Sequence, residues 1–282
     1  MNVIKLNLYS EQGEIVVVPL GDLHIGEETF DTTLLKDTIA EVLDHDNWYV
    51  VLGGDYIQNN IYKKIDGIFG EVSPETQLAL AKEYLLPLAK TDEKHPHGRI
   101  LCMVEGNHEA RSTKETGISP AQMLCSALSI EGNGLEKRYS ESECFLFLTV
   151  SIRGKPSSNR VVYTVDVTHG AGSGVSMGSA MNNLHKMCNR LSGCMCYVMF
   201  HHHKPMVAKQ DHLHAYDGKV KRETQLLVMG NAFADGTYAE KKSMELTSRT
   251  VPRIRFYCVR RIKKERGRVV MDTTFKNVEA TL

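Results

Sequence analysis

The sequence has no excess of charge of either sign and no long hydrophobic run. Its 282 residues include 34 Lys and Arg against 34 Asp and Glu, so no global field attracts DNA or an acidic membrane. No apolar run approaches the ~20 residues of a membrane span. The N-terminal residues 1–9 lack the basic and apolar regions of a secretory signal. We therefore expect no membrane association.

The cysteines show no pairing pattern. The seven cysteines are an odd number and are scattered along the chain, which argues against a disulfide framework. Cys194 and Cys196 lie in an apolar run and are interpreted as core thiols. The expected compartment is a reducing cytoplasm.

The first half of the chain alternates strand and helix patterns. Residues 3–9 alternate apolar and polar side chains, which predicts a strand at a sheet edge or in a hairpin. Further strands are expected at 14–20, 48–52 and 99–104, and helices at 31–45, 74–89 and 119–129. This alternation is typical of a layered α/β sheet.

The second half is richer in strands. Strands are expected at 144–152, 160–167, 194–200, 205–209, 223–230, 253–261 and 268–275, with one helix at 177–191. Together the halves predict an α/β fold in which two mixed β-sheets pack face to face with helices outside. The absence of a linker or repeat predicts one domain, 1–282, which includes the β-rich part at about 205–282.

Five short blocks of polar residues carry the chemistry, and at least four of them directly follow an apolar run. They are Gly21-Asp22-Leu23-His24, Gly53-Gly54-Asp55, Gly106-Asn107-His108-Glu109, Thr168-His169-Gly170 and His201-His202-His203. Asp and His are suitable ligands for a borderline divalent metal such as Mn²⁺, Fe²⁺ or Zn²⁺. Blocks of this type at several strand ends predict one metal centre.

Spacing indicates which side chains share an ion. Residues two apart in an extended chain point to the same side, so Asp22 and His24 can reach one ion. The same alternation selects His201 and His203 as ligands and turns His202 away, toward packing or solvent. Asp55 follows two glycines that allow a sharp turn, and its two carboxylate oxygens can bridge two ions.

In order and composition, these blocks resemble the calcineurin-like metallophosphoesterases over about residues 15–205. The family pattern is Asp-x-His, Gly-Asp, Gly-Asn-His-Asp/Glu, His-Gly and Gly-His-x-His; here Phe200 stands in place of the last glycine. The resemblance implies a four-layer α/β/β/α sandwich. It also implies two divalent ions, with Mn²⁺ favoured and Fe, Zn or Ni as alternatives.

The resemblance also assigns roles to residues. Asp22, His24, Asp55 and His203 would hold one metal, and Asp55, Asn107, His169 and His201 the other. His108 would act at the leaving-group oxygen, and Glu109 would orient it as a hydrogen-bond acceptor. The implied reaction is hydrolysis of a phosphate ester by in-line attack of a metal-activated hydroxide.

Other residues suggest substrate contacts. Arg111 is a candidate phosphate contact, and His202 is kept as a second candidate. Gly172 lies in a glycine-rich loop, 170–174, whose N–H groups either face a phosphate or form a flexible loop. Residues 253–268 include eight basic side chains and one acidic side chain. They form either a solvated sheet edge or a surface that binds the backbone of DNA or RNA. Residues 211–214 have ligand-like spacing but are expected in an exposed loop or along the substrate cleft.

Three functions fit this sequence. The Ser/Thr protein phosphatases of the family carry two substrate-binding arginines that are missing from residues 54–60 and at Glu105. We therefore expect a phosphodiesterase, with nucleic acid as a candidate substrate. The alternatives are a phosphomonoesterase acting on a nucleotide or small metabolite, and a non-catalytic scaffold. The sequence does not decide between a monomer and a homodimer.

Overall fold

The computed structural model describes residues 1–11, 13–59, 72–130, 132–152, 160–172, 176–234, 248–265 and 268–282, without the side chains of 214, 216, 221 and 259–275. Among these residues it contains two six-stranded sheets and five α-helices. None of the described helices is both long and apolar enough to cross a membrane.

The first sheet has the strand order β12-β11-β2-β3-β4-β5. Its strands are β2 (Glu14–Leu20), β3 (Trp48–Leu52), β4 (Ile100–Val104), β5 (Tyr139–Ser140), β11 (Arg253–Glu265) and β12 (Arg268–Thr281). Strands β2 to β5 run parallel, and β11 joins β2 in the antiparallel direction. Helices α1 (Thr32–Asp44), α2 (Pro74–Ala89) and α4 (Pro120–Leu128) bury their apolar residues with this sheet.

The second sheet has the order β1-β6-β7-β8-β10-β9. Its strands are β1 (Asn2–Ser10), β6 (Glu143–Ile152), β7 (Arg160–Thr168), β8 (Cys196–Met199), β9 (Met206–Tyr216) and β10 (Lys219–Met229). Strands β7, β8 and β10 run parallel to one another. Helix α5 (Met177–Arg190) covers the outer face, while β1 lies at the edge, as the alternating pattern predicts.

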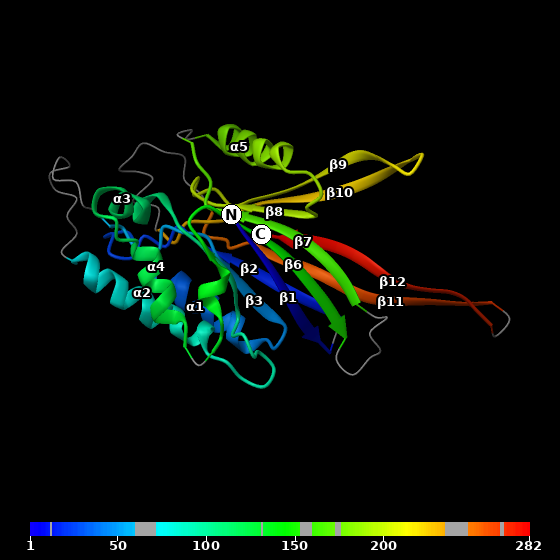
Figure 1. The fold of residues 1–282 in the computed structure, drawn as a ribbon, viewed down its shortest axis with the longest axis horizontal. Helices are drawn as coiled ribbons and strands as arrows, with labels where there is room; N and C mark the ends of the chain where they lie inside the picture. The colour runs from blue at the N-terminus through cyan, green and yellow to red at the C-terminus, as the bar shows by residue number, and fades with distance from the viewer. Residues whose placement is uncertain are drawn as a thin grey trace.

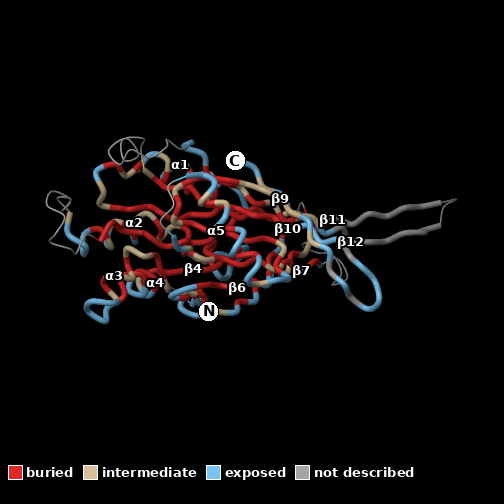
Figure 2. The backbone as a smooth tube through the Cα atoms, turned by 90° about the horizontal axis from the view of Figure 1, so that it is seen from above, coloured by how far each residue is buried: buried red, intermediate tan, exposed pale blue. Residues whose placement is uncertain are grey.

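Three separate apolar clusters define the layers. One lies between the sheets and joins side chains such as Val17, Leu146 and Phe256. The second packs α1, α2 and α4 on the first sheet, and the third packs α5 on the second. Figure 1 shows this α/β/β/α order, and Figure 2 shows the buried residues concentrated in the interior of the molecule. The predicted fold class is confirmed.

Some local predictions differ from the structure. The expected helices 31–45 and 177–191 begin and end within a few residues of α1 and α5, but their apolar residues Leu43 and Met177 are exposed. Residues 211–214 lie within β9 rather than in a loop, because pairing with β10 extends through the whole hairpin. A further helix, α3 (Asn107–Thr116), was not predicted, because its sequence has no apolar stripe.

A single aromatic ring determines how closely the strand ends approach. Phe200, directly after β8, is fully buried. A Cβ added at Gly21, Gly53 or Gly230 would lie within 2.5 Å of its ring. The ring therefore occupies the space that the three missing side chains leave free. Phe200 thus anchors the ends of both sheets beneath the predicted ligand blocks.

Candidate metal centre

All five ligand blocks lie just beyond the carboxyl ends of strands. Asp22 follows β2, Asp55 follows β3 and Asn107 follows β4, and these three strands are parallel neighbours. His169 follows β7 and the histidine triplet follows β8, parallel neighbours in the other sheet. The topology therefore gathers the five blocks at one end of the two packed sheets.

The backbone at these blocks is unusual. Seven described non-glycine residues have positive φ, and five of them are predicted ligands: Asp22, His24, Asp55, His201 and His203, with φ between 49° and 76°. This region disfavours side chains with a Cβ, and such strain typically gathers at functional sites. The period-2 argument for His201 and His203 assumed an extended strand, whereas both residues lie past the end of β8 and have positive φ.

The first ligand group comprises Asp22, His24 and His203, whose ligand atoms lie within 4.8 Å of one another. The Nε2 atoms of His24 and His203 are 3.1 Å apart. Oδ1 of Asp22 lies 3.7 Å from Nε2 of His203. Two imidazole nitrogens and a carboxylate oxygen therefore converge on one point.

The second group comprises Asp55, His169 and His201, again within 4.8 Å. Nε2 of His169 lies 3.4 Å from Oδ2 of Asp55 and 2.9 Å from Oδ1 of Asn107. Asn107 thus adds a neutral oxygen to this group. The structure brings together all seven residues predicted as ligands.

Asp55 connects the two groups through one oxygen rather than two. Its Oδ1 accepts a hydrogen bond from the His108 amide at 2.8 Å. Its Oδ2 faces Nε2 of His169 at 3.4 Å and Nε2 of His24 at 3.9 Å. Oδ2 is therefore the oxygen placed toward both ligand groups, while Oδ1 is held by the backbone of the next block.

Hydrogen bonds on the far side of each ring fix which nitrogen faces the centre. Nδ1 of His24 lies 2.9 Å from Oε1 of Gln58, and Nδ1 of His169 lies 2.8 Å from the Gly53 carbonyl. Nε2 of His201 lies 2.7 Å from the Gly172 carbonyl. If each acceptor receives the ring N–H, the other nitrogen keeps its lone pair for a metal.

His108 and Glu109 lie in the first turn of α3. Nδ1 of His108 lies 2.7 Å from the Gln58 carbonyl, and its Nε2 lies 3.9 Å from Oδ2 of Asp55. The acceptor that orients His108 is therefore Gln58, and the predicted role of Glu109 is wrong. Glu109 is fully buried and instead accepts hydrogen bonds from the backbone N–H groups of Asp55, Ile57 and Gly106. These bonds hold the turn at Asp55 against the start of α3.

Charge is distributed unevenly among the rings. Burial lowers the pKa of His24, His108 and His201, and that of His203 to about 4, so these four rings are neutral at pH 7. Burial also opposes the charged form of His169, but the Asp55 and Asp22 carboxylates raise its pKa to about 10. His169 in turn holds the pKa of Asp55 well below its usual range despite burial.

The donor set fits a divalent cation. Oδ1 of Asp22 is buried and has no hydrogen-bond partner within the described residues, although the His201 amide satisfies Oδ2. A buried carboxylate oxygen without a partner is costly unless a cation or donor faces it. Burial raises the pKa of Asp22 to about 7, although the charge of His169 opposes the shift. A bound cation would stabilise the ionised form.

The three candidate substrate contacts lie in different surroundings. The positive charge of Arg111 contributes to the lowered pKa of both His108 and His201, so its guanidinium lies near the centre. Gly172 presents its carbonyl to His201, and residues 173 and 174 of its loop lie outside the described residues. His202 is buried, and its Nε2 lies 3.1 Å from Nδ2 of Asn183 in α5. This contact supports the packing interpretation for His202.

Residues 211–214 are not part of the centre. Asp211 is exposed on β9, where Arg222 and Thr224 of β10 hydrogen-bond its carboxylate. The ligand-like spacing there reflects cross-strand pairing on an exposed hairpin.

The sequence comparisons agree with this geometry. Residues 15–223 match the calcineurin-like phosphoesterase family, and the chain belongs to it. A comparison with curated proteins gives no match. Membership, together with the clustered Asp and His side chains, makes the protein a metal-dependent phosphoesterase that binds divalent metal.

Metal affinity is expected to rise with pH. At pH 7, His169, with a pKa of about 10, carries a proton, and Asp22, with a pKa of about 7, is partly protonated. Binding must displace these protons, so the apparent association constant should rise about tenfold per pH unit above neutrality and more steeply below it. Competition of Mn²⁺ with a chelator from about pH 6 to about pH 8.5 measures this slope. A pH-independent affinity would show that His169 is not a ligand.

Proposed function

We propose that the protein is a dinuclear metal-dependent phosphodiesterase. The observation that carries the proposal is the position of Asp55 Oδ2 between the two ligand groups, facing His169 on one side and His24 on the other. Asp22, His24, Asp55 and His203 would hold one ion, and Asp55, Asn107, His169 and His201 the other. Two carboxylates, one amide oxygen and four imidazoles favour Mn²⁺, with Fe, Zn and Ni as alternatives.

The bound ions would supply Lewis acidity and lower the pKa of a bound water. Hydrolysis then forms one P–O bond from water and breaks the bond to the leaving alcohol, which receives a proton. His108 is the residue placed to give that proton, because Nε2 faces the centre while Nδ1 is held by Gln58. The negative charge of a bound phosphate ester would favour protonation of this ring, which burial keeps neutral beforehand.

The charge available for the phosphoryl group favours a diester. A diester carries one negative charge, whereas a monoester carries about 1.5 to 2 near neutrality. Among the described residues, Arg111 supplies one guanidinium near His108 and His201, and the two arginines of the protein phosphatases are missing. This smaller positive charge suits the smaller negative charge of a diester.

The basic residues between 253 and 268 give little support to a nucleic-acid substrate. Arg253 is paired with Glu41, and Arg255 with Glu14. These two arginines therefore serve the fold, and the side chains from 259 to 268 lie outside the described part of the chain. DNA or RNA remains a candidate substrate through the diester chemistry alone. The seven cysteines are buried and unpaired, which supports a reducing compartment such as the cytoplasm.

Paired ester hydrolysis tests the diesterase proposal. With Mn²⁺ present, kcat/KM for bis-p-nitrophenyl phosphate is expected to exceed that for p-nitrophenyl phosphate by about tenfold, since the described part of the site offers a phosphate one guanidinium, which suits a monoanion better than a dianion. Both assays release the same chromophore, so the rates compare directly. A preference for the monoester would favour the phosphomonoesterase alternative.

A further inference from the structure

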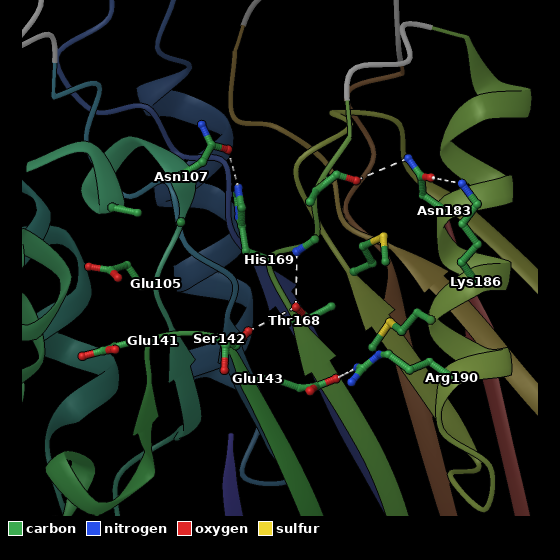
Figure 3. Close-up of a pocket in the computed structure, with 16 residues that line it drawn as sticks. Glu105, Asn107, Glu141, Ser142, Glu143, Thr168, His169, Asn183, Lys186 and Arg190 are labelled. Carbon is green, nitrogen blue, oxygen red and sulfur yellow. Dashed lines mark hydrogen bonds and ion pairs between the residues drawn. The ribbon is translucent and has the colours of Figure 1, made fainter. Parts of the chain in front are cut away.

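A cavity of about 590 Å³ opens beside the second ligand group. One wall is α3 with Asn107 and Ala110, and the opposite wall is α5 with Asn183 and Lys186. His169 lies between the two walls, as Figure 3 shows. This volume is within the range of about 300–1,000 Å³ typical of small-molecule sites.

The cavity and His108 lie on different sides of the centre. The His108 ring packs against His24, with centroids 4.6 Å apart, and so belongs to the side of the first ligand group. The cavity wall includes Asn107 and His169 of the second group but none of Asp22, His24, His108 or His203. A leaving group next to His108 therefore points away from the cavity. The space beyond His169 is open to the other substituent of the ester.

The cavity walls carry opposite charges. Arg190 on α5 is already paired with Glu143. Lys186 donates only to Oδ1 of Asn183, at 3.5 Å, and no carboxylate lies within ion-pair distance of it among the described residues. Lys186 is thus the cation on this wall that is available to a ligand. Across the cavity, exposed Glu141 provides an acceptor for hydroxyl or amino groups, whereas Oε1 of Glu105 already accepts hydrogen bonds from Thr113 and Ser119.

Apolar side chains complete the site. Met187 of α5, Met199 of β8 and Ala110 of α3 also line the cavity. Flexible thioether side chains pack well against flat rings. The cavity therefore combines an apolar surface for a base, an acceptor for sugar hydroxyls and one cation for a phosphate.

We infer that this cavity binds the retained substituent of a phosphodiester, and that this substituent is a nucleotide whose further phosphate contacts Lys186. The inference rests on the proposed diesterase function. It explains why a diester is needed to use the whole site: a monoester has no second organic substituent to occupy the cavity.

Two matched substrates test the role of Lys186. Thymidine 5′-(p-nitrophenyl phosphate), with and without a 3′-phosphate, share one leaving group and differ only in the charge on the retained side. The wild-type enzyme is expected to prefer the 3′-phosphorylated substrate, and Lys186→Ala to lower that preference by about three- to fivefold, as for a partly exposed charge pair. Lys186→Gln should do the same. Lys82→Ala, an exposed lysine on α2 outside the cavity, is the matched control and should keep the preference.

A cavity-filling variant tests the position of the substituent independently of charge. Ala110→Leu places a larger side chain in the cavity from a helix that tolerates leucine. The ratio of kcat/KM for thymidine 5′-(p-nitrophenyl phosphate) to that for p-nitrophenyl phosphate is expected to fall by at least about tenfold. Continued hydrolysis of the monoester shows that the variant is folded and has bound metal.

The outcomes separate the two proposals. If no phosphate ester is hydrolysed with Mn²⁺ present, the proposed function fails. If bis-p-nitrophenyl phosphate is hydrolysed but the Lys186 and Ala110 variants keep the wild-type ratios, only the cavity assignment is overturned. A wild-type enzyme that does not distinguish the two thymidine substrates would also overturn the role of Lys186.

Discussion

Replacing Asp55 with Asn is expected to lower kcat/KM by at least about a thousandfold and to reduce bound metal. Oδ2 of Asp55 is the one oxygen that faces His24, His108 and His169 together. An amide keeps the shape and can still accept the His108 amide proton, but it provides no negative charge between the two proposed ions. The loss therefore reflects charge and bridging rather than folding.

Metal content and activity should be measured on the same preparation. Asp37→Asn, at an exposed position on α1, is the matched control and should keep wild-type metal content and turnover. Thermal unfolding of the metal-free proteins separates a folding defect from a metal defect. An Asp55→Asn enzyme with full metal content and normal turnover would refute the bridging role.

Replacing His108 with Ala is expected to lower kcat by about 10²–10⁴-fold while metal content stays close to that of the wild type. The His108 ring points at the centre through Nε2, but the amide of His108, which the substitution keeps, is the group that holds Asp55. The defect should depend on the leaving group. A nucleoside leaving group needs the proton, whereas p-nitrophenolate leaves readily without it.

Comparing a dinucleotide with its p-nitrophenyl analogue measures this dependence. The loss should be about tenfold or more greater for the dinucleotide. His97→Ala, at an exposed position before β4, serves as the control for removing an imidazole. Equal losses on both substrates would show that His108 acts by positioning rather than by donating a proton.

The sequence predicted the layers, and it predicted which blocks would gather at one end of the sheets, because both depend on local pattern. Apolar runs marked β2, β3 and β4, and the blocks after them fell at strand ends that the topology gathers. The pairing of β1 with β6 was beyond such reasoning, since it joins residues more than 130 positions apart. Helix α3 was missed because its turns carry polar side chains and its buried Glu109 bonds to a backbone far along the chain.

The roles of individual side chains were harder to predict than their types. The sequence assigned the orienting role to Glu109, and only the fold shows that Gln58 contacts both His24 and His108. The α5 wall of the cavity gave no sequence signal. Asn183 and Lys186 look like ordinary polar helix residues until α5 is placed opposite α3.

The ligand blocks come from both sheets: Asp22, His24 and Asp55 follow strands of one, and His169 and His203 follow strands of the other. An ion held there would cross-link the two halves of the interior and stabilise the folded chain by about 4 kcal/mol at a thousand times its Kd. Unfolded chains are the ones that cellular proteases remove. The amount of this protein in a cell would therefore follow the supply of free metal, independently of any change in its synthesis.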